Sequence, residues 1–172
     1  MLRQFYRDRR GTAAVEFAFV APIMLLMYFG TAELTQGMMA SRRASHVAST
    51  VGDLVTQAAY LSQADIDDIF SVGNAIMKPF PTGTLSIRFS SIKSDSVGSL
   101  SIACTKHSGS YSDLTSTAGV PNGLLTTNDS IILAEASYTY TSPLQKIIPK
   151  PVVFTSSYYL KPRKSAEVVC LP

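Results

Sequence analysis

The sequence is poor in the residues that most catalytic and metal sites require. Its 172 residues include two histidines, two cysteines and no tryptophan. Neither His46 nor His107 has a partner at the spacing of an HExxH or CxxC motif, and the chain has no GxSxG, Walker or GxGxxG motif. We therefore expect no catalytic residue, no metal and no cofactor, and we predict that the protein is not an enzyme.

Charged residues are also scarce, at 16% of the chain, and they are unevenly placed. The tail of residues 1–11 has one aspartate, Asp8, against four arginines: Arg3, Arg7, Arg9 and Arg10. This tail accounts for the whole formal net charge of +3, so the remainder of the chain is neutral. A basic tail beside an apolar run indicates a cytoplasmic anchor, and we expect no nucleic-acid partner.

The chain does contain one long apolar run, which extends from Thr12 to about Ala32. A membrane-spanning helix needs about 20 such residues, whereas the core of a secretory signal has roughly 7–15. The positive-inside rule keeps the arginine-rich terminus in the cytoplasm, although Arg42 and Arg43 on the other side weaken the contrast. We predict a single-pass transmembrane helix over residues 12–34 and an exported portion over residues 35–172.

Helical periodicity precedes strand periodicity along the exported portion. A stripe of apolar residues at helical spacing continues the first helix, and "SQAD" at Ser62 resembles the capping box of a second helix that ends before Pro79. Alternating segments follow, at "TLSIRFSSI", "SLSIACT", "DSIILAEASYTYT", "VVFTSSYYL" and "AEVVCL", and the first two suggest a hairpin. This order predicts an α+β fold, with helices packed on a small antiparallel sheet.

The two cysteines, Cys104 and Cys170, each share the apolar face of a predicted strand. In an exported chain they favour a disulfide, which would contribute roughly 4 kcal/mol by closing a long loop. The alternative is a pair of buried free thiols, as expected in a reducing compartment.

Glu16 is the residue that a simple membrane anchor does not explain. An acidic residue at the centre of a membrane helix costs roughly 2.5–3.5 kcal/mol on insertion scales. Because Glu16 lies close to the start of the run, it could instead be an ordinary carboxylate in the headgroup layer. Glu33, near the other end, is interpreted as interfacial.

The segment "GTAAVEF" suggests a more specific role. Gly11 is followed by Thr12, and Glu16 is the fifth residue counted from Thr12, as in type IV prepilins. The wider stretch "RRGTAAVEFAFVAPIMLLMYFGTAEL" resembles the N-terminal signature of the TadE/TadG-like minor pilins, or pseudopilins, of the tight-adherence (Tad, or Flp) pilus system. The terminal "YYLKPRKS" is also similar to the Pro-Arg segment of such proteins.

This resemblance implies a type IV pilin-like fold and a role in pilus assembly and cell adhesion. Residues 1–11 would be a basic leader, cut by a prepilin peptidase between Gly11 and Thr12. Glu16 would then set the axial register by pairing with a freshly made N-terminal amine, while Pro22 would bend or loosen the helix. The implied partners are the inner membrane, the major Flp-type pilin and other minor pilins, the peptidase and the assembly platform.

The implied location is the bacterial inner membrane, with the N-terminus cytoplasmic, the C-terminal domain periplasmic or extracellular, and the subunit incorporated in the pilus. Two other hypotheses remain at this point. The protein could be an unprocessed, membrane-anchored envelope protein accessory to the pilus or secretion apparatus, or an exported enzyme on a membrane stalk. Whether the mature N-terminus is cut distinguishes the processed pilin from the unprocessed envelope protein. The scarcity of histidine argues against the exported enzyme.

Overall fold

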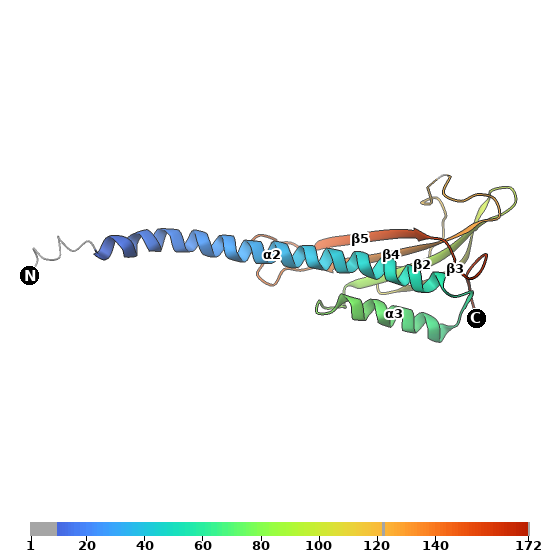
Figure 1. Ribbon diagram of the computed structural model, residues 1–172, viewed down its shortest axis with the longest axis horizontal. Coiled ribbons are helices and arrows are strands. Elements are labelled where there is room, and N and C mark those ends of the chain that lie inside the picture. The colour runs from blue at the N-terminus through green and yellow to red at the C-terminus, as the bar shows by residue number, and fades with distance from the viewer. Residues whose placement is uncertain (1–9, 122, 172) are drawn as a thin grey trace, which may run out of the picture. The chain divides into compact units, whose positions relative to one another are not determined.

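The computed structural model describes residues 10–121 and 123–171 (Figure 1). It contains helix α2 (Arg10–Thr56), strand β1 (Tyr60–Leu61), helix α3 (Gln63–Met77) and five later strands, which are β2 (Leu85–Ser94), β3 (Leu100–Ser108), β4 (Ser130–Tyr140), β5 (Val152–Leu160) and β6 (Val169–Cys170). Helices precede the sheet, and the predicted α+β class is confirmed. Most of the proposed leader lies outside the described residues.

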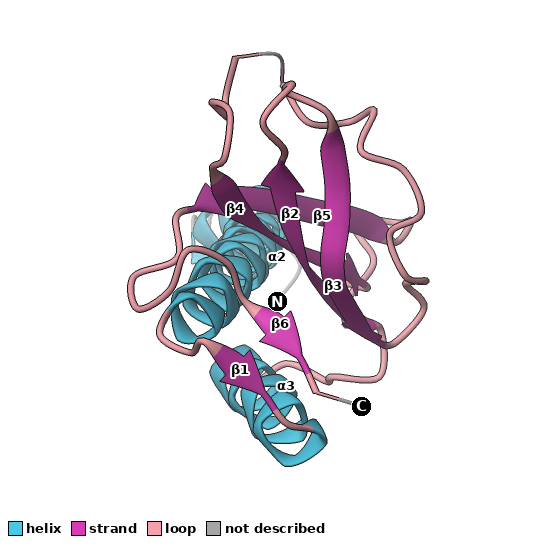
Figure 2. Cartoon of the chain, turned by 90° about the vertical axis from the view of Figure 1, so that its right-hand side faces the viewer, coloured by secondary structure: helices cyan, strands magenta, loops and turns pink. Residues whose placement is uncertain are grey.

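The chain divides into two compact units, which are described separately. One unit contains residues Met1–Gly37 and Thr141–Lys150, and the other contains Met38–Tyr140 and Pro151–Pro172. The second unit holds the sheet, α3 and the C-terminal part of α2 (Figure 2).

The sheet of the second unit has four strands in the order β3-β2-β4-β5, and all neighbours are antiparallel. The predicted hairpin between β2 and β3 is confirmed, and a register shift interrupts it at Ser91 and Ile92. The short strand β6 does not join this sheet but pairs in parallel with β1. The order places β2 and β4 at the centre of the sheet, where both strands have neighbours on each side.

The inner face of the sheet packs against the two helices. The predicted inward face of β4 is buried throughout, at Ile132, Ala134, Ala136, Tyr138 and Tyr140. The C-terminal part of α2 presents a stripe of small and β-branched residues, which are fully buried: Ala40, Ala44, Val47, Ala48, Val51 and Val55. Their spacing of three and four residues puts them on one helical face.

Two glycines let the helices approach their neighbours closely. A Cβ atom at Gly52 of α2 would lie 2.9 Å from the Cβ of Ala134 and 2.6 Å from Cδ1 of Leu160. A Cβ at Gly73 of α3 would lie 2.5 Å from Cδ1 of Ile87. Glycine at these positions therefore serves the packing, although it lowers intrinsic helix propensity.

Helix α3 starts as the sequence predicts. The Ser62 hydroxyl accepts a hydrogen bond from the Asp65 amide, and the Asp65 carboxylate accepts one from the Ser62 amide, which completes a capping box. The hydrogen bonds from Ser62 lower the pKa of Asp65. The buried face contains Ile66, Ile69, Phe70, Gly73 and Met77. Ala75 lies outside this face and is exposed.

Candidate functional site

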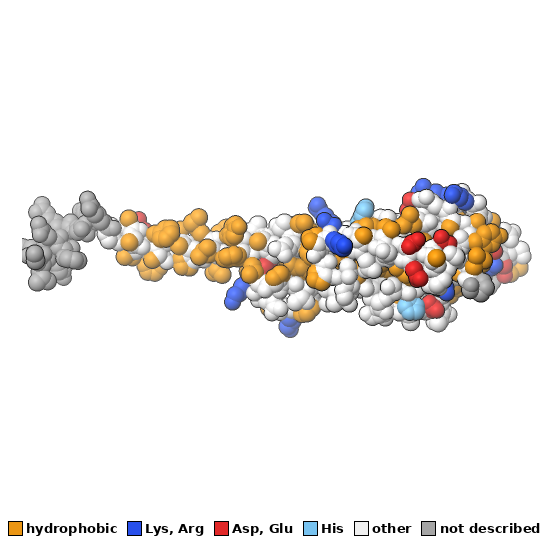
Figure 3. All heavy atoms as spheres, turned by 90° about the horizontal axis from the view of Figure 1, so that it is seen from below, with side chains coloured by type: hydrophobic (Ala, Val, Ile, Leu, Met, Phe, Trp, Pro, Cys, Tyr) orange, Lys and Arg blue, Asp and Glu red, His pale blue; other side chains and the backbone are white. Residues whose placement is uncertain are grey.

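The N-terminal part of α2 is an apolar helix with almost no cover. Residues 11–20 and 22–29 are all exposed, and large apolar side chains dominate this surface, with Phe19 exposed to 74% (Figure 3). The helix is long and apolar enough to cross a membrane. A soluble protein rarely exposes a continuous apolar surface of this extent, so the helix needs lipid or other helices around it.

The predicted processing and register residues lie together in the first turns of this helix. Gly11 and Thr12 precede Glu16, and Thr12 and Glu16 share one helical face because they are four residues apart. Glu16 is exposed, and its carboxylate makes no ion pair with any residue that the structure describes. The helix continues without interruption past Pro22.

Gly11 has open space around it. An added Cβ atom would meet no described atom within 4 Å. Packing against the described residues therefore does not require glycine at this position, in contrast to Gly52 and Gly73.

Glu33 occupies the opposite environment. Its side chain is buried, and its carboxylate accepts three backbone hydrogen bonds from the segment that joins β4 to β5. The amides of Lys146, Ile147 and Ile148 donate these bonds over 2.9, 2.7 and 3.0 Å. The sequence interpretation of Glu33 as interfacial missed these contacts, because nothing near residue 33 in the sequence points to partners more than a hundred residues away.

The same segment also contacts α2 through Gly30. An added Cβ at Gly30 would lie 3.1 Å from Cγ1 of Ile147. Gly30 and Glu33 are about one helical turn apart, so they lie on the same face of α2. Together they form the surface of α2 that the segment between β4 and β5 contacts.

In the second unit, the outer face of the sheet is covered by the connection between β3 and β4. A small apolar cluster forms there from Ile92, Val120, Ile131 and Leu133, with Leu100, Leu114 and Leu125 packed against it. The connection is otherwise rich in serine, threonine, glycine and asparagine. Its sparse apolar residues are what hold it on the sheet.

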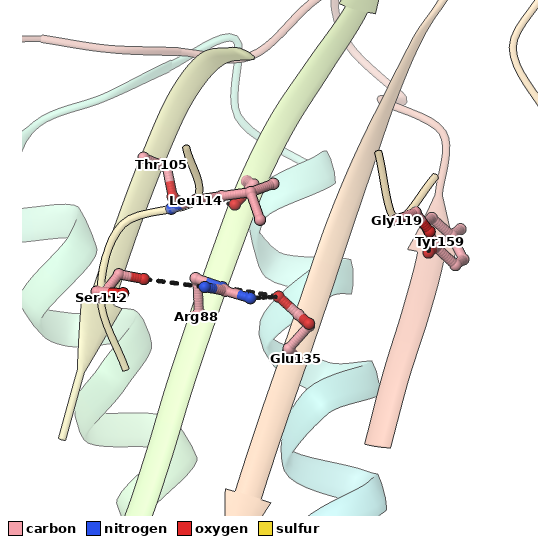
Figure 4. Close-up of polar contacts among 8 residues, drawn as sticks. Arg88, Thr105, Ser112, Leu114, Gly119, Glu135 and Tyr159 are labelled. Carbon is pink, nitrogen blue, oxygen red and sulfur yellow. Dashed lines mark hydrogen bonds and ion pairs between the residues drawn. The ribbon is translucent and has the colours of Figure 1, made fainter. Parts of the chain in front are cut away.

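Hydrogen bonds fasten this connection to three strands (Figure 4). The Arg88 guanidinium donates to the Ser112 carbonyl and forms an ion pair of 2.7 Å with Glu135. The Leu114 amide donates to Thr105 Oγ1, and the Tyr159 hydroxyl donates to the Gly119 carbonyl. The Arg88 guanidinium also stacks over the ring of Tyr111, 4.8 Å from its centroid. Burial, followed by the charge of Glu135, raises the pKa of Tyr111.

The disulfide between Cys104 and Cys170 is present and joins β3 to β6, with the two Cα atoms 5.6 Å apart. Because β6 also pairs with β1, the bond connects the edge of the main sheet to the chain between the two helices. The prediction of a disulfide is confirmed.

Among residues 10–121 and 123–171 there is no group of three or more His, Cys, Asp or Glu side chains that could hold a metal ion. His107 contacts only one carboxylate in this part of the chain, that of Asp113, over 2.8 Å at an exposed position. The site that the structure offers is therefore the apolar helix with its two contrasting glutamates.

Comparison with known proteins bears on the same region. A search of curated protein sequences and a search of solved structures each found no match. The family model described as TadE-like protein matches residues 11–53, which begin at Gly11 and run through nearly the whole of α2. Over its N-terminal helix, this chain is therefore similar to TadE-like proteins.

Proposed function

We propose that this protein is a minor pilin or pseudopilin of a Tad (Flp)-type pilus. A prepilin peptidase cuts the chain between Gly11 and Thr12, and residues 12–34 span the inner membrane before assembly. The basic leader faces the cytoplasm and residues 35–172 are exported. The mature subunit enters the fibre through its apolar helix, where it meets the major Flp-type pilin and other minor pilins at the assembly platform.

The observation that carries this proposal is the carboxylate of Glu16, which forms no ion pair with a described residue and lies five residues after Gly11 on an exposed apolar helix. A membrane anchor does not need Glu16, because an acidic residue adds no apolar burial near the start of the span and costs roughly 2.5–3.5 kcal/mol at the helix centre. Cutting before Thr12 creates an amine about 6 Å along the helix axis from Glu16 at about 1.5 Å per residue. When helices bundle, this amine, from the same subunit or a neighbour, can neutralise the carboxylate.

Pairing of this kind also specifies register. A bundle shifted by one turn would bury an unpaired charge, which costs several kcal/mol. The apolar side chains around Glu16 are tolerant of sliding because dispersion contacts are non-directional. A single ion pair is therefore enough to select one axial position.

The surroundings of Gly11 and the disulfide support the same assignment. Packing does not explain glycine at position 11, but a peptidase that must reach the backbone does. The disulfide between Cys104 and Cys170 is typical of an oxidising, exported compartment.

Mass spectrometry of the protein isolated from cells with an active prepilin peptidase tests the processing step. We expect a mature N-terminus at Thr12 and a chain that starts at Met1 when Gly11 is replaced by leucine. Ala14→Leu, which introduces the same side chain three residues away, is the control and should leave cleavage intact. A wild-type chain that still starts at Met1 would instead indicate an uncut envelope protein.

The Glu16→Leu variant tests the register step. It should insert in the membrane and be cut normally, yet reduce incorporation into pili by at least about tenfold, because loss of 1.4 kcal/mol already gives that factor. Phe17→Leu changes a neighbouring exposed residue and should assemble normally. Counting labelled subunits in sheared pili measures the effect, and wild-type incorporation of the Glu16 variant would refute the register role.

A further inference from the structure

The segment between β4 and β5, residues Thr141–Lys150, has an unusual surface for a loop. It contains two lysines, two prolines and no acidic residue. Two of its apolar side chains remain largely exposed, because Leu144 is 44% exposed and Ile147 is 50% exposed even though Ile147 also contacts α2 at Gly30. Lys146 and Lys150 are exposed beside them. Exposed apolar side chains interleaved with cations are typical of protein surfaces that lie against anionic lipid.

Three backbone amides of this segment already have hydrogen-bond acceptors within the protein. The amides of residues 146–148 donate to the buried Glu33 carboxylate, so they need no water. Backbone groups without partners are costly near the hydrocarbon of a membrane. The same three bonds shield the negative charge of Glu33, which would otherwise repel anionic headgroups.

The attachment point on α2 determines the depth of the segment. Glu33 is one residue before the end of the proposed span of residues 12–34, and the absence of a side chain at Gly30 lets Ile147 lie against the same turn. About 20 helical residues cross the hydrocarbon core, so position 33 reaches the headgroup layer on the exported side. This step rests on the membrane span of the proposed function.

We propose that residues 141–150 form a foot that binds the anionic outer surface of the inner membrane before the subunit enters the fibre. Leu144 and Ile147 enter the boundary between headgroups and acyl chains, while Lys146 and Lys150 contact lipid phosphates. Glu33 is the positioning residue, because it holds the backbone of the foot against α2. The binding partner is a phospholipid surface, and no protein contact is needed.

The test uses the full chain reconstituted in vesicles of phosphatidylcholine with phosphatidylglycerol. The two native cysteines are disulfide-bonded, so a single introduced cysteine takes a fluorophore selectively. Labels are placed at Leu144→Cys and Ile147→Cys. Val97→Cys, which is 84% exposed in the second unit, is the aqueous control, and Phe19→Cys is the control for the span.

We expect the labels at 144 and 147 to be quenched by a nitroxide lipid. Their iodide quenching should be roughly threefold or more below that of the Val97 label, as for an interfacial segment. If iodide quenches the labels at 144 and 147 as strongly as the Val97 label, while the nitroxide lipid quenches the Phe19 label, the proposed foot is refuted and the membrane span is not. Shielding from iodide without lipid quenching would assign the segment to a protein contact and also overturn it. Failure of lipid quenching at Phe19 would remove the span itself, and with it the proposed function.

Separate variants test the charge of the two lysines and the positioning role of Glu33. In the Ile147→Cys chain, the double change Lys146→Gln and Lys150→Gln should raise iodide quenching in vesicles with phosphatidylglycerol and leave it unchanged in pure phosphatidylcholine. Lys164→Gln, at another exposed lysine, should have no effect. Glu33→Ala should raise iodide quenching in both lipids, since the backbone loses its acceptor, and Glu33→Gln should raise it less. If iodide quenches all these variants as it quenches the Ile147→Cys chain without further changes, the roles of the lysines and of Glu33 are refuted.

Discussion

Two glutamates of α2 show how one residue type acquires two different tasks. Glu16 lies on an exposed apolar surface without a described partner, whereas Glu33 is buried and accepts three backbone hydrogen bonds. A carboxylate with three donors is already satisfied, and it holds a segment of its own chain. A carboxylate without them must be satisfied by something else, and in our proposal that is an amine made by proteolysis.

Asp129 carries a prediction about pH. Its carboxylate accepts hydrogen bonds from Lys161 Nζ over 2.6 Å and from the Ser130 amide over 2.9 Å. The bond from Lys161, ahead of the other contacts, lowers the pKa of Asp129. A carboxyl group whose pKa is lower in the folded state contributes stability above its unfolded pKa of about 3.9, and this stability is lost as pH falls through the folded pKa.

Asp129→Asn should therefore lower the Tm of the full chain in detergent at neutral pH. The difference from wild type should start to shrink as the pH falls below about 4, and it should disappear below the lowered folded-state pKa, where the wild-type carboxyl is protonated too. Lys161→Gln removes the donor and should give the same pH profile. A Tm difference that does not change with pH would show that the ion pair is not its cause.

At the scale of elements, close packing in the second unit depends on small residues. Gly52 lets α2 approach β4 and β5, and Gly73 lets α3 approach β2. A helix that carries alanine and glycine along its buried face lies nearer its sheet than one lined by leucine, and its contacts are correspondingly sensitive to volume.

Gly52→Val should destabilise the fold by about 1–3 kcal/mol, the usual cost of overpacking, because Ala134 has no flexible side chain that can move aside. Gly83→Ala is the control, since an added Cβ there meets nothing within 4 Å, and it should change stability by less than about 0.5 kcal/mol. Denaturant unfolding of the full chain in detergent measures both. A neutral Gly52 variant would mean that α2 can shift on the sheet.

At the scale of the whole chain, the disulfide is a covalent connection between distant segments. It joins cysteines 66 residues apart and attaches the C-terminal strand β6 to the main sheet. The double variant Cys104→Ser and Cys170→Ser should lose about 2–5 kcal/mol of stability, the usual cost of removing a native disulfide. Reductant should lower the Tm of wild type but not that of the double variant. Equal Tm values for wild type with and without reductant would contradict a stabilising role.

Much of the fold followed from local patterns. The Ser62 capping box, the end of α3 before Pro79 and the alternation of Ile132 to Tyr140 each rest on residues within a few positions of one another, so periodicity and capping rules reach them. The strand at "AEVVCL" was expected, but its pairing with β1 was not. A two-residue strand has too little pattern to specify a partner.

The candidate site divides in the same way. By itself, the sequence determined the apolar helix and the spacing of Gly11, Thr12 and Glu16, because a helix relates near neighbours by a fixed rise and rotation. Only the tertiary structure decided that Glu33 is buried, since its donors lie 113 to 115 residues further along the chain. Contacts across that distance depend on how the elements pack, and no local pattern in the sequence records them.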